Sequence, residues 1–197
     1  SCVNNVNVVN TAEHITDRPY PGLRPFRFEE SDIFFGREEH TDQLLEKLGE
    51  TRFISVVGLS GCGKSSLVRA GMIAALRSGY LAEAGTHWRI AILRPGEHPF
   101  ANLAQALLAE AGLTKEYVVV FGQENATEAT LLPVVQTALQ SGAFSLVEIM
   151  RRTELPPNTN LLICVDQFEE LFRYHREGGQ DEAEAFVKLL LTSAQQD

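Results

Sequence analysis

A glycine-rich segment between an apolar run and an amphipathic pattern constrains the fold of this chain more than any other feature. The apolar run Phe53–Val57 leads directly into Gly58–Ser65, which reads Gly-x-x-x-x-Gly-Lys-Ser. Glycines permit the tight turn that points backbone N–H groups at a phosphate, and the following helix presents the positive end of its dipole. The order strand, loop, helix is the context that a phosphate-binding loop requires. The segment therefore predicts a loop that binds a nucleoside triphosphate.

The residues of this loop have predicted roles that follow from their chemistry. The Lys64 ammonium is expected to reach the β- and γ-phosphates and to act in catalysis, and the Ser65 hydroxyl is expected to bind Mg²⁺. The predicted nucleotide-binding residues of the loop are Gly58, Ser60, Gly61, Cys62, Gly63, Lys64, Ser65 and Ser66. The alternative, a glycine-rich turn with an exposed lysine, does not explain the flanking strand and helix patterns.

Composition limits the class of protein and its partners. The 197 residues suffice for one domain with a hydrophobic core, and 44% hydrophobic with 22% charged residues is typical of globular proteins. A net charge of −9 without a Lys/Arg stripe argues against nucleic-acid binding by this segment. The three cysteines lack metal-ligand spacing, and no apolar run is long enough to span a membrane. We therefore expect a cytoplasmic protein without a membrane partner.

The N-terminal part is predicted to differ from the rest. Residues 1–18 are polar and rich in asparagine, so we expect a linker or leader to an upstream domain. The three prolines and one glycine of Pro19–Phe26 exclude a helix there. A first helix should follow Phe34–Glu38, and its inner face would consist of Leu44, Leu45 and Leu48.

Strand and helix patterns alternate along the remaining sequence. Strands are predicted for Phe53–Val57, Trp88–Leu93 and Leu161–Val165, and Tyr117–Phe121 is either a strand or an extra apolar turn. Helices are predicted over residues 64–77, 100–110, 131–140, 144–152 and 181–193. This alternation predicts an α/β domain over residues 19–197, with three layers and a parallel sheet whose site lies at the carboxyl ends of the strands.

An acidic group follows the third predicted strand. Asp166 comes directly after Leu161–Val165 and is expected to hold the Mg²⁺ ion beside Ser65. Glu169 and Glu170 begin the next helix, and one of them is placed to orient or deprotonate the water that attacks the γ-phosphate. The alternative is that both glutamates only complement the helix dipole.

Five blocks of sequence, in this order, resemble the novel STAND NTPase type 1 domain. They are Pro19–Phe26, Phe34–Glu38, Val57–Gly71, Leu93–Gly96 and Val165–Phe172. STAND proteins are signal-transducing ATPases with numerous domains, related to the NACHT and NB-ARC switches of animal and plant immunity. The resemblance implies a bacterial switch that binds ATP or ADP with Mg²⁺ and hydrolyses ATP slowly. It also implies oligomerisation through the NTPase domain, sensor and effector domains in the full-length chain, and a role in defence against phage.

The resemblance also assigns roles by position. Lys64 and Ser65 match the Walker A phosphate and magnesium residues, and Asp166 matches the Walker B acid. Glu169 and Glu170 match the trailing acids of the extended Walker B motif in NACHT domains. Many additive-strand ATPases carry the catalytic glutamate directly after the Walker B acid. This chain has an amide there, which cannot act as a base.

Arg37 belongs to a Phe-Gly-Arg sequence that matches a motif near the adenine and ribose in STAND relatives. It is therefore predicted to bind nucleotide. The alternative is an ordinary residue at a helix start that pairs with a nearby glutamate.

Later parts of the family pattern are not found in this sequence. In such ATPases a sensor strand follows the Walker B helix and lies between the two motif-bearing strands, and a winged-helix domain closes over the nucleotide. We therefore predict an additive-strand P-loop domain that is truncated before these parts and binds nucleotide weakly. A gap in its sheet would be filled by Val3–Val9 or by a neighbouring chain.

Two other functions stay open at this point. A binding module would hold the nucleotide structurally and serve as a scaffold without significant hydrolysis. A nucleotide-kinase-like phosphotransferase would need an arginine-rich lid, and no such segment is visible. Guanine selectivity is disfavoured, because no Asn-Lys-x-Asp motif occurs.

Overall fold

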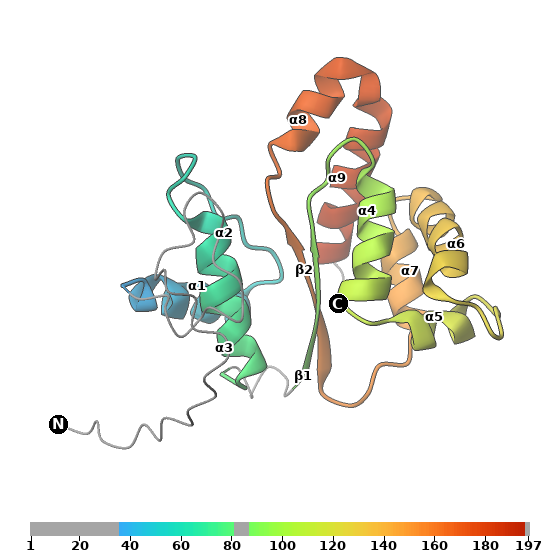
Figure 1. The fold of residues 1–197 in the computed structure, drawn as a ribbon, viewed down its shortest axis with the longest axis horizontal. Helices are drawn as coiled ribbons and strands as arrows, with labels where there is room; N and C mark the ends of the chain where they lie inside the picture. The colour runs from blue at the N-terminus through green and yellow to red at the C-terminus, as the bar shows by residue number, and fades with distance from the viewer. Residues whose placement is uncertain (1–35, 81–86, 196–197) are drawn as a thin grey trace, which may run out of the picture.

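Two parallel strands lie at the centre of the molecule. The computed structural model describes residues 36–80 and 87–195, so the predicted linker, the proline-rich segment and Val3–Val9 lie outside the described residues. Strands β1 (His87–Leu93) and β2 (Thr159–Val165) are paired in register from His87 with Thr159 to Leu93 with Val165. Helices lie on both sides of this pair (Figure 1), which makes the fold α/β, as predicted.

The helices on one side carry the predicted phosphate loop. They are α1 (Glu38–Glu50), α2 (Lys64–Ser66), η2 (Leu67–Ile73) and α3 (Ala74–Arg77). The last three form one continuous helix, because the residues at their junctions keep right-handed helical angles, and η2 has the wider turns of a π-helix. A Cβ atom at Gly71 would lie 2.5 Å from Thr41 Oγ1, so glycine allows this helix to approach α1 closely. Apolar residues of both helices pack with Ile90 of β1.

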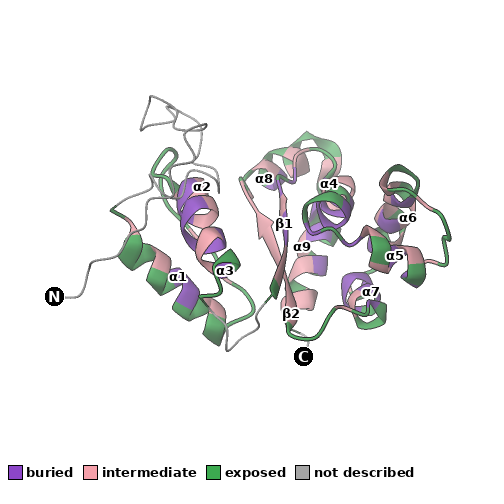
Figure 2. Ribbon diagram, turned by 60° about the horizontal axis from the view of Figure 1, so that its bottom comes forward, coloured by how far each residue is buried: buried purple, intermediate pink, exposed green. Residues whose placement is uncertain are grey.

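The helices on the other side enclose the larger part of the core. They are α4 (Pro99–Gln105), η3 (Ala106–Glu110), α5 (Thr114–Val120), α6 (Glu128–Gln140), α7 (Ser145–Arg152), α8 (Glu170–Tyr174), η4 (His175–Gly179) and α9 (Gln180–Ala194). Figure 2 shows that their buried residues face one another and the strand pair. No helix within residues 36–80 and 87–195 combines the length and apolar character that crossing a bilayer requires.

Phe53–Val57 is not a strand, which corrects the prediction of a strand directly before the phosphate loop. Ile54 and Val56 pack against the cluster of α1 and η2, whereas Phe53 and Val57 are 56% and 89% exposed. This alternation is that of a strand, but a strand also needs a neighbour for its N–H and C=O groups. In the described part of the chain, only β1 and β2 are paired with each other.

Tyr117–Phe121 lies mainly in helix α5, so the strand, one of the two alternatives given for this segment, is wrong. Tyr117 and Val120 are buried while Val119 is 78% exposed, which is the spacing of a helix and not of a strand. The Tyr117 ring also contacts Phe121 edge to face, with 5.8 Å between the ring centroids. A short apolar run does not distinguish these two structures by periodicity alone.

Candidate functional site

Ser65 and Asp166 are in direct contact although 101 residues separate them in sequence. Ser65 Oγ donates a hydrogen bond to Asp166 Oδ1 at 2.7 Å. Ser65 is the second residue of α2, and Asp166 directly follows β2. The Asp166 N–H donates to the carbonyl of Leu93 at 2.8 Å, which continues the strand pairing and holds the carboxylate at the end of the sheet. The structure thus brings together the two residues predicted to bind magnesium.

The loop before α2 has a backbone that depends on glycine. Gly61 and Gly63 have φ angles of 76° and 85°, a left-handed region that other residues rarely adopt. The Cys62 N–H donates to the Leu59 carbonyl at 3.2 Å and closes a tight turn. Ser60 and the loop glycines are exposed, whereas Ser66 is buried within the helix at 8% exposure. The exposed turn and the helix start that follows it together suit a phosphate group.

The Lys64 side chain folds back across this loop. Its Nζ atom donates to the carbonyls of Gly58 and Leu59, at 2.8 Å and 3.0 Å. Both acceptors are neutral, so within the described part of the chain these contacts do not pair the positive charge of Lys64 with a carboxylate. The ammonium is therefore placed at the loop, where an anionic phosphate would be a stronger acceptor than a carbonyl.

Arg37 contacts the same loop from the start of α1. Its Nη2 atom donates to the Cys62 carbonyl at 2.7 Å, although 25 residues separate the two. The acid beside it, Glu38, accepts a hydrogen bond from the Gly36 N–H at 3.0 Å. Hydrogen bonds from the backbone N–H groups of Glu38 and Gly36 lower the pKa of the Glu38 carboxyl. The Arg37 guanidinium thus donates to the phosphate loop, whereas the Glu38 carboxylate accepts from the Gly36 N–H.

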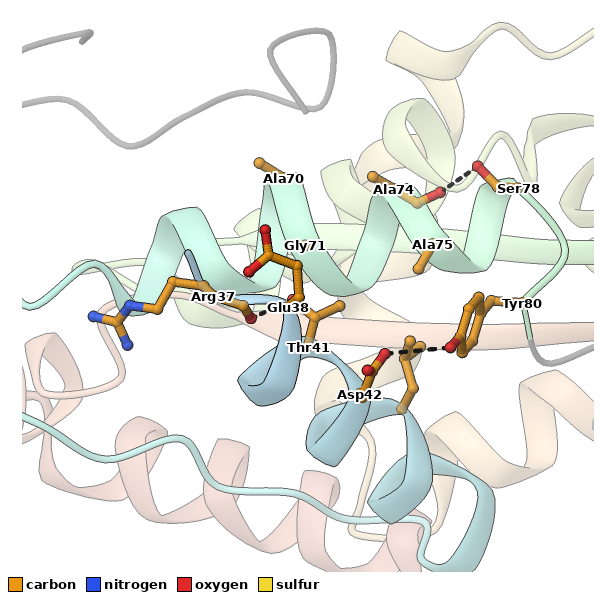
Figure 3. A pocket seen from close by; sticks show the side chains of 11 residues that line it. Arg37, Glu38, Thr41, Asp42, Ala70, Gly71, Ala74, Ala75, Ser78 and Tyr80 are labelled. Atoms are coloured by element: carbon orange, nitrogen blue, oxygen red, sulfur yellow. Dashed lines mark hydrogen bonds between the residues drawn. The ribbon is translucent and has the colours of Figure 1, made fainter. Parts of the chain in front are cut away.

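An open groove of about 260 Å³ lies between α1 and the helix that follows the loop. Tyr80 Oη donates to Asp42 Oδ1 at 3.3 Å across one end of it, and the Arg37 side chain extends away from it (Figure 3). Of the predicted site residues, Arg37 is the one that lines this groove. The groove therefore does not coincide with the contact between Ser65 and Asp166.

The two glutamates after Asp166 have different surroundings. Glu170 is partly buried, and its Oε2 atom accepts a hydrogen bond from the Gly96 N–H at 3.1 Å. Glu170 thereby ties the start of α8 to the loop that follows β1. Glu169 occupies the N-cap position of the same helix, makes no capping hydrogen bond with its side chain and is exposed to solvent. Gln167, between Asp166 and Glu169, has a φ of 56° and is also exposed.

Arg69 is a site residue that the sequence analysis did not identify. Its Nη2 atom lies 3.3 Å from Asp166 Oδ2, on the other oxygen of the carboxylate that Ser65 contacts. Arg69 follows Ser65 by four residues, so both lie on one face of the same helix. That spacing was the available signal, but the pairing with Asp166 spans 97 residues and needs the tertiary structure.

The donor atoms at this contact suit Mg²⁺. A serine hydroxyl and a carboxylate are the oxygen ligands that this ion prefers, and it usually keeps several waters and binds phosphate oxygens as well. Within the described residues, no cluster of three His, Cys, Asp or Glu side chains is available for a metal. A magnesium ion at Ser65 and Asp166 would therefore take its other ligands from water and nucleotide.

A comparison with models of protein families covers this region of the chain. A family model described as novel STAND NTPase 1 matches residues 19–197, a range that includes the loop, Asp166 and both glutamates. Among curated proteins and among solved structures, the comparison finds no match. The chain belongs to the novel STAND NTPase 1 family.

Proposed function

We propose that this chain is the ATP-binding domain of a signal-transduction switch and that it hydrolyses ATP slowly. The observation that carries the proposal is the contact between Ser65 and Asp166, which joins a phosphate-type loop to an acid at a strand end. Membership of the novel STAND NTPase 1 family supports an NTPase.

We propose the following roles for the residues of this site. The loop N–H groups and Lys64 would hold the phosphates, and Ser65 with Asp166 would hold the metal. Magnesium, when bound with nucleotide, neutralises charge on the β- and γ-phosphates. Glu169, which is exposed at the start of α8, would orient or deprotonate the attacking water.

An additive-strand arrangement of the P-loop fold is part of the proposal. That arrangement places one strand between the two motif-bearing segments. In the described residues, Phe53–Val57 is not paired with β2, yet Ile54 and Val56 already face the helices as strand residues would. Because Phe53–Val57 and β2 are not paired, a further strand could lie between them, as the additive-strand arrangement requires.

The biological setting of the proposal depends on the family resemblance. We propose control of oligomerisation by the bound nucleotide, sensor and effector domains in the full-length protein, a cytoplasmic location and a role against phage. The competing function is a scaffold that holds nucleotide without significant hydrolysis, and the exposed amide of Gln167 is the observation that favours it.

Replacement of Lys64 tests whether the loop binds nucleotide. Lys64→Ala is expected to weaken binding of ATP with Mg²⁺ on the order of 100-fold, because it removes a charge-assisted contact to the phosphates. Isothermal titration calorimetry on the whole chain measures this affinity. Lys188→Ala, which removes an exposed lysine of α9, is the matched control and should bind ATP like the unmodified chain. Equal affinities of the two variants would contradict the proposal.

Alkylation of Cys62 should block the binding of ATP, because this exposed side chain lies in the phosphate loop. A Cβ atom at Gly58 would lie 2.9 Å from Cys62 Sγ, so a group added to the sulfur occupies the space beside the loop. Cys164 is an internal control, since burial raises the pKa of its thiol to about 12 and keeps it protonated near pH 8.

The reaction is carried out with N-ethylmaleimide in a Cys2→Ser background, and mass spectrometry identifies the modified residue. ATP affinity should fall in proportion to the modified fraction of Cys62. Unchanged affinity after complete modification would refute this prediction.

A further inference from the structure

Ser65 and Arg69 each contact a different oxygen of the Asp166 carboxylate. Ser65 Oγ donates to Asp166 Oδ1 at 2.7 Å, and Arg69 Nη2 lies 3.3 Å from Oδ2. Both partners come from one face of the helix that follows the loop. A single helix therefore fixes the direction of the Asp166 side chain, with Oδ1 towards Ser65.

The ion pair lies in a partly buried place, where its charge is less screened than on an open surface. The side chains of Asp166 and Arg69 are 15% and 30% exposed. Arg69 Nε is buried and has no hydrogen-bond partner in the part of the chain that the structure describes. Cys164, two residues before Asp166, packs against the apolar cluster formed by α1, η2, α3 and Ile90.

We propose that Arg69 is a positioning residue that makes metal binding at Asp166 depend on nucleotide, an inference that rests on the proposed function. Without nucleotide, the guanidinium charge repels a divalent cation from Asp166 and holds the carboxylate towards Ser65. When a nucleotide is bound, the negative charges of its phosphates offset this repulsion. The chain then takes up the metal together with the nucleotide and not before it.

The size of the effect follows from Coulomb's law. A charge of +1 and a charge of +2 that are about 5 Å apart repel each other enough, even at the dielectric constant of water, to change an affinity on the order of 10-fold. Removal of the Arg69 charge should therefore tighten the binding of metal alone by this factor. Replacement by lysine keeps the charge and should leave the affinity near its original value.

Binding of Mn²⁺ without nucleotide tests the inference directly. The electron paramagnetic resonance signal of free Mn²⁺ measures the dissociation constant for the unmodified chain and for Arg69→Gln, Arg69→Lys and Asp166→Asn. Arg89→Gln is the matched control, because Arg89 forms a similar ion pair with Glu116, at 3.4 Å. Arg69→Gln should bind Mn²⁺ about 10-fold more tightly. The Arg69→Lys and Arg89→Gln variants should match the unmodified chain.

Three outcomes distinguish this inference from the proposed function. If Asp166→Asn binds Mn²⁺ in the presence of ADP as well as the unmodified chain does, the metal site of the proposed function is wrong. If Asp166→Asn loses Mn²⁺ in the presence of ADP but Arg69→Gln binds Mn²⁺ alone no more tightly than the unmodified chain, only the role of Arg69 is overturned. If Arg69→Lys behaves like Arg69→Gln, the contribution of Arg69 is geometric and the charge argument fails.

A second measurement needs no variant and covers the case in which Arg69→Gln does not fold. Thermal unfolding of the unmodified chain should shift little with Mn²⁺ alone. It should shift more with ADP plus Mn²⁺ than with ADP plus EDTA, because ligands that bind the folded state raise its stability. A shift with Mn²⁺ alone as large as the shift with ADP plus Mn²⁺ would overturn the inference.

Discussion

Glu169→Gln is expected to lower the rate of ATP hydrolysis by about 10²–10⁴-fold, which is the usual contribution of a general base. Glu169 lies three residues after Asp166, at the cap of α8, and its side chain is exposed. An amide keeps the size of the carboxylate but cannot accept the proton of the attacking water. The affinity for ATP should not change, because the phosphates are held by the loop.

Single-turnover hydrolysis of radiolabelled ATP by the unmodified chain and by Glu169→Gln measures this effect, with calorimetry for the affinity. Glu170→Gln is the matched variant. Its amide oxygen can still accept the hydrogen bond from the Gly96 N–H, so the loop after β1 keeps its anchor. We expect a much smaller loss of rate for Glu170→Gln.

These hydrolysis measurements also decide between the ATPase switch and the nucleotide-binding scaffold. A larger loss for Glu170→Gln would contradict the assignment of Glu169 as the base. If the unmodified chain binds ATP but hydrolyses it no faster than Lys64→Ala does, the scaffold function is favoured.

Phe186→Ala is expected to lower the free energy of unfolding by about 3–5 kcal/mol, the range typical of a fully buried aromatic residue. Phe186 has 0% exposure, and its ring meets Phe100 edge to face with 5.5 Å between the centroids. This contact joins α9 to α4 on the side of the sheet that holds the larger part of the core. Since domains are stable by only about 5–15 kcal/mol, the variant should lose much of its stability.

Urea unfolding followed by circular dichroism measures this loss. Phe172→Ala is the matched control, because Phe172 also contacts another ring, Phe168, at 6.1 Å but is 63% exposed. It should cost about 1 kcal/mol or less, since surface replacements rarely cost more. If both variants lose a similar amount of unfolding free energy, the packing of Phe186 against Phe100 is not a major source of stability.

The chain order of most elements could be predicted because the signals are local. The predicted strand Trp88–Leu93 lies within β1, and Leu161–Val165 lies within β2. The helix predicted over residues 64–77 coincides with the continuous helix formed by α2, η2 and α3. In each case a run of apolar residues, a proline or a glycine marks the boundary within a few residues. Membership of the STAND family, inferred from five short blocks, is confirmed by the family match.

The adjacency of Ser65 and Asp166 could also be expected from sequence, for a less local reason. A phosphate loop and an acid that each follow a strand signal are expected at the same edge of a parallel sheet. The roles of these residues in binding metal and nucleotide stay predictions, which the variants above test.

The sequence by itself determined the loop, the acid, the two strand segments and the family, because each depends on residues close together in the chain. Only the tertiary structure decided that Phe53–Val57 has no strand partner among residues 36–80 and 87–195, and that Arg69 contacts the same carboxylate of Asp166 as Ser65 does. The tertiary structure also distinguished the two glutamates: Glu170 accepts a hydrogen bond from the Gly96 N–H, whereas Glu169 is exposed. Each of these depends on contacts between distant segments, and backbone or charge pairing across such distances leaves no periodic signal in the sequence.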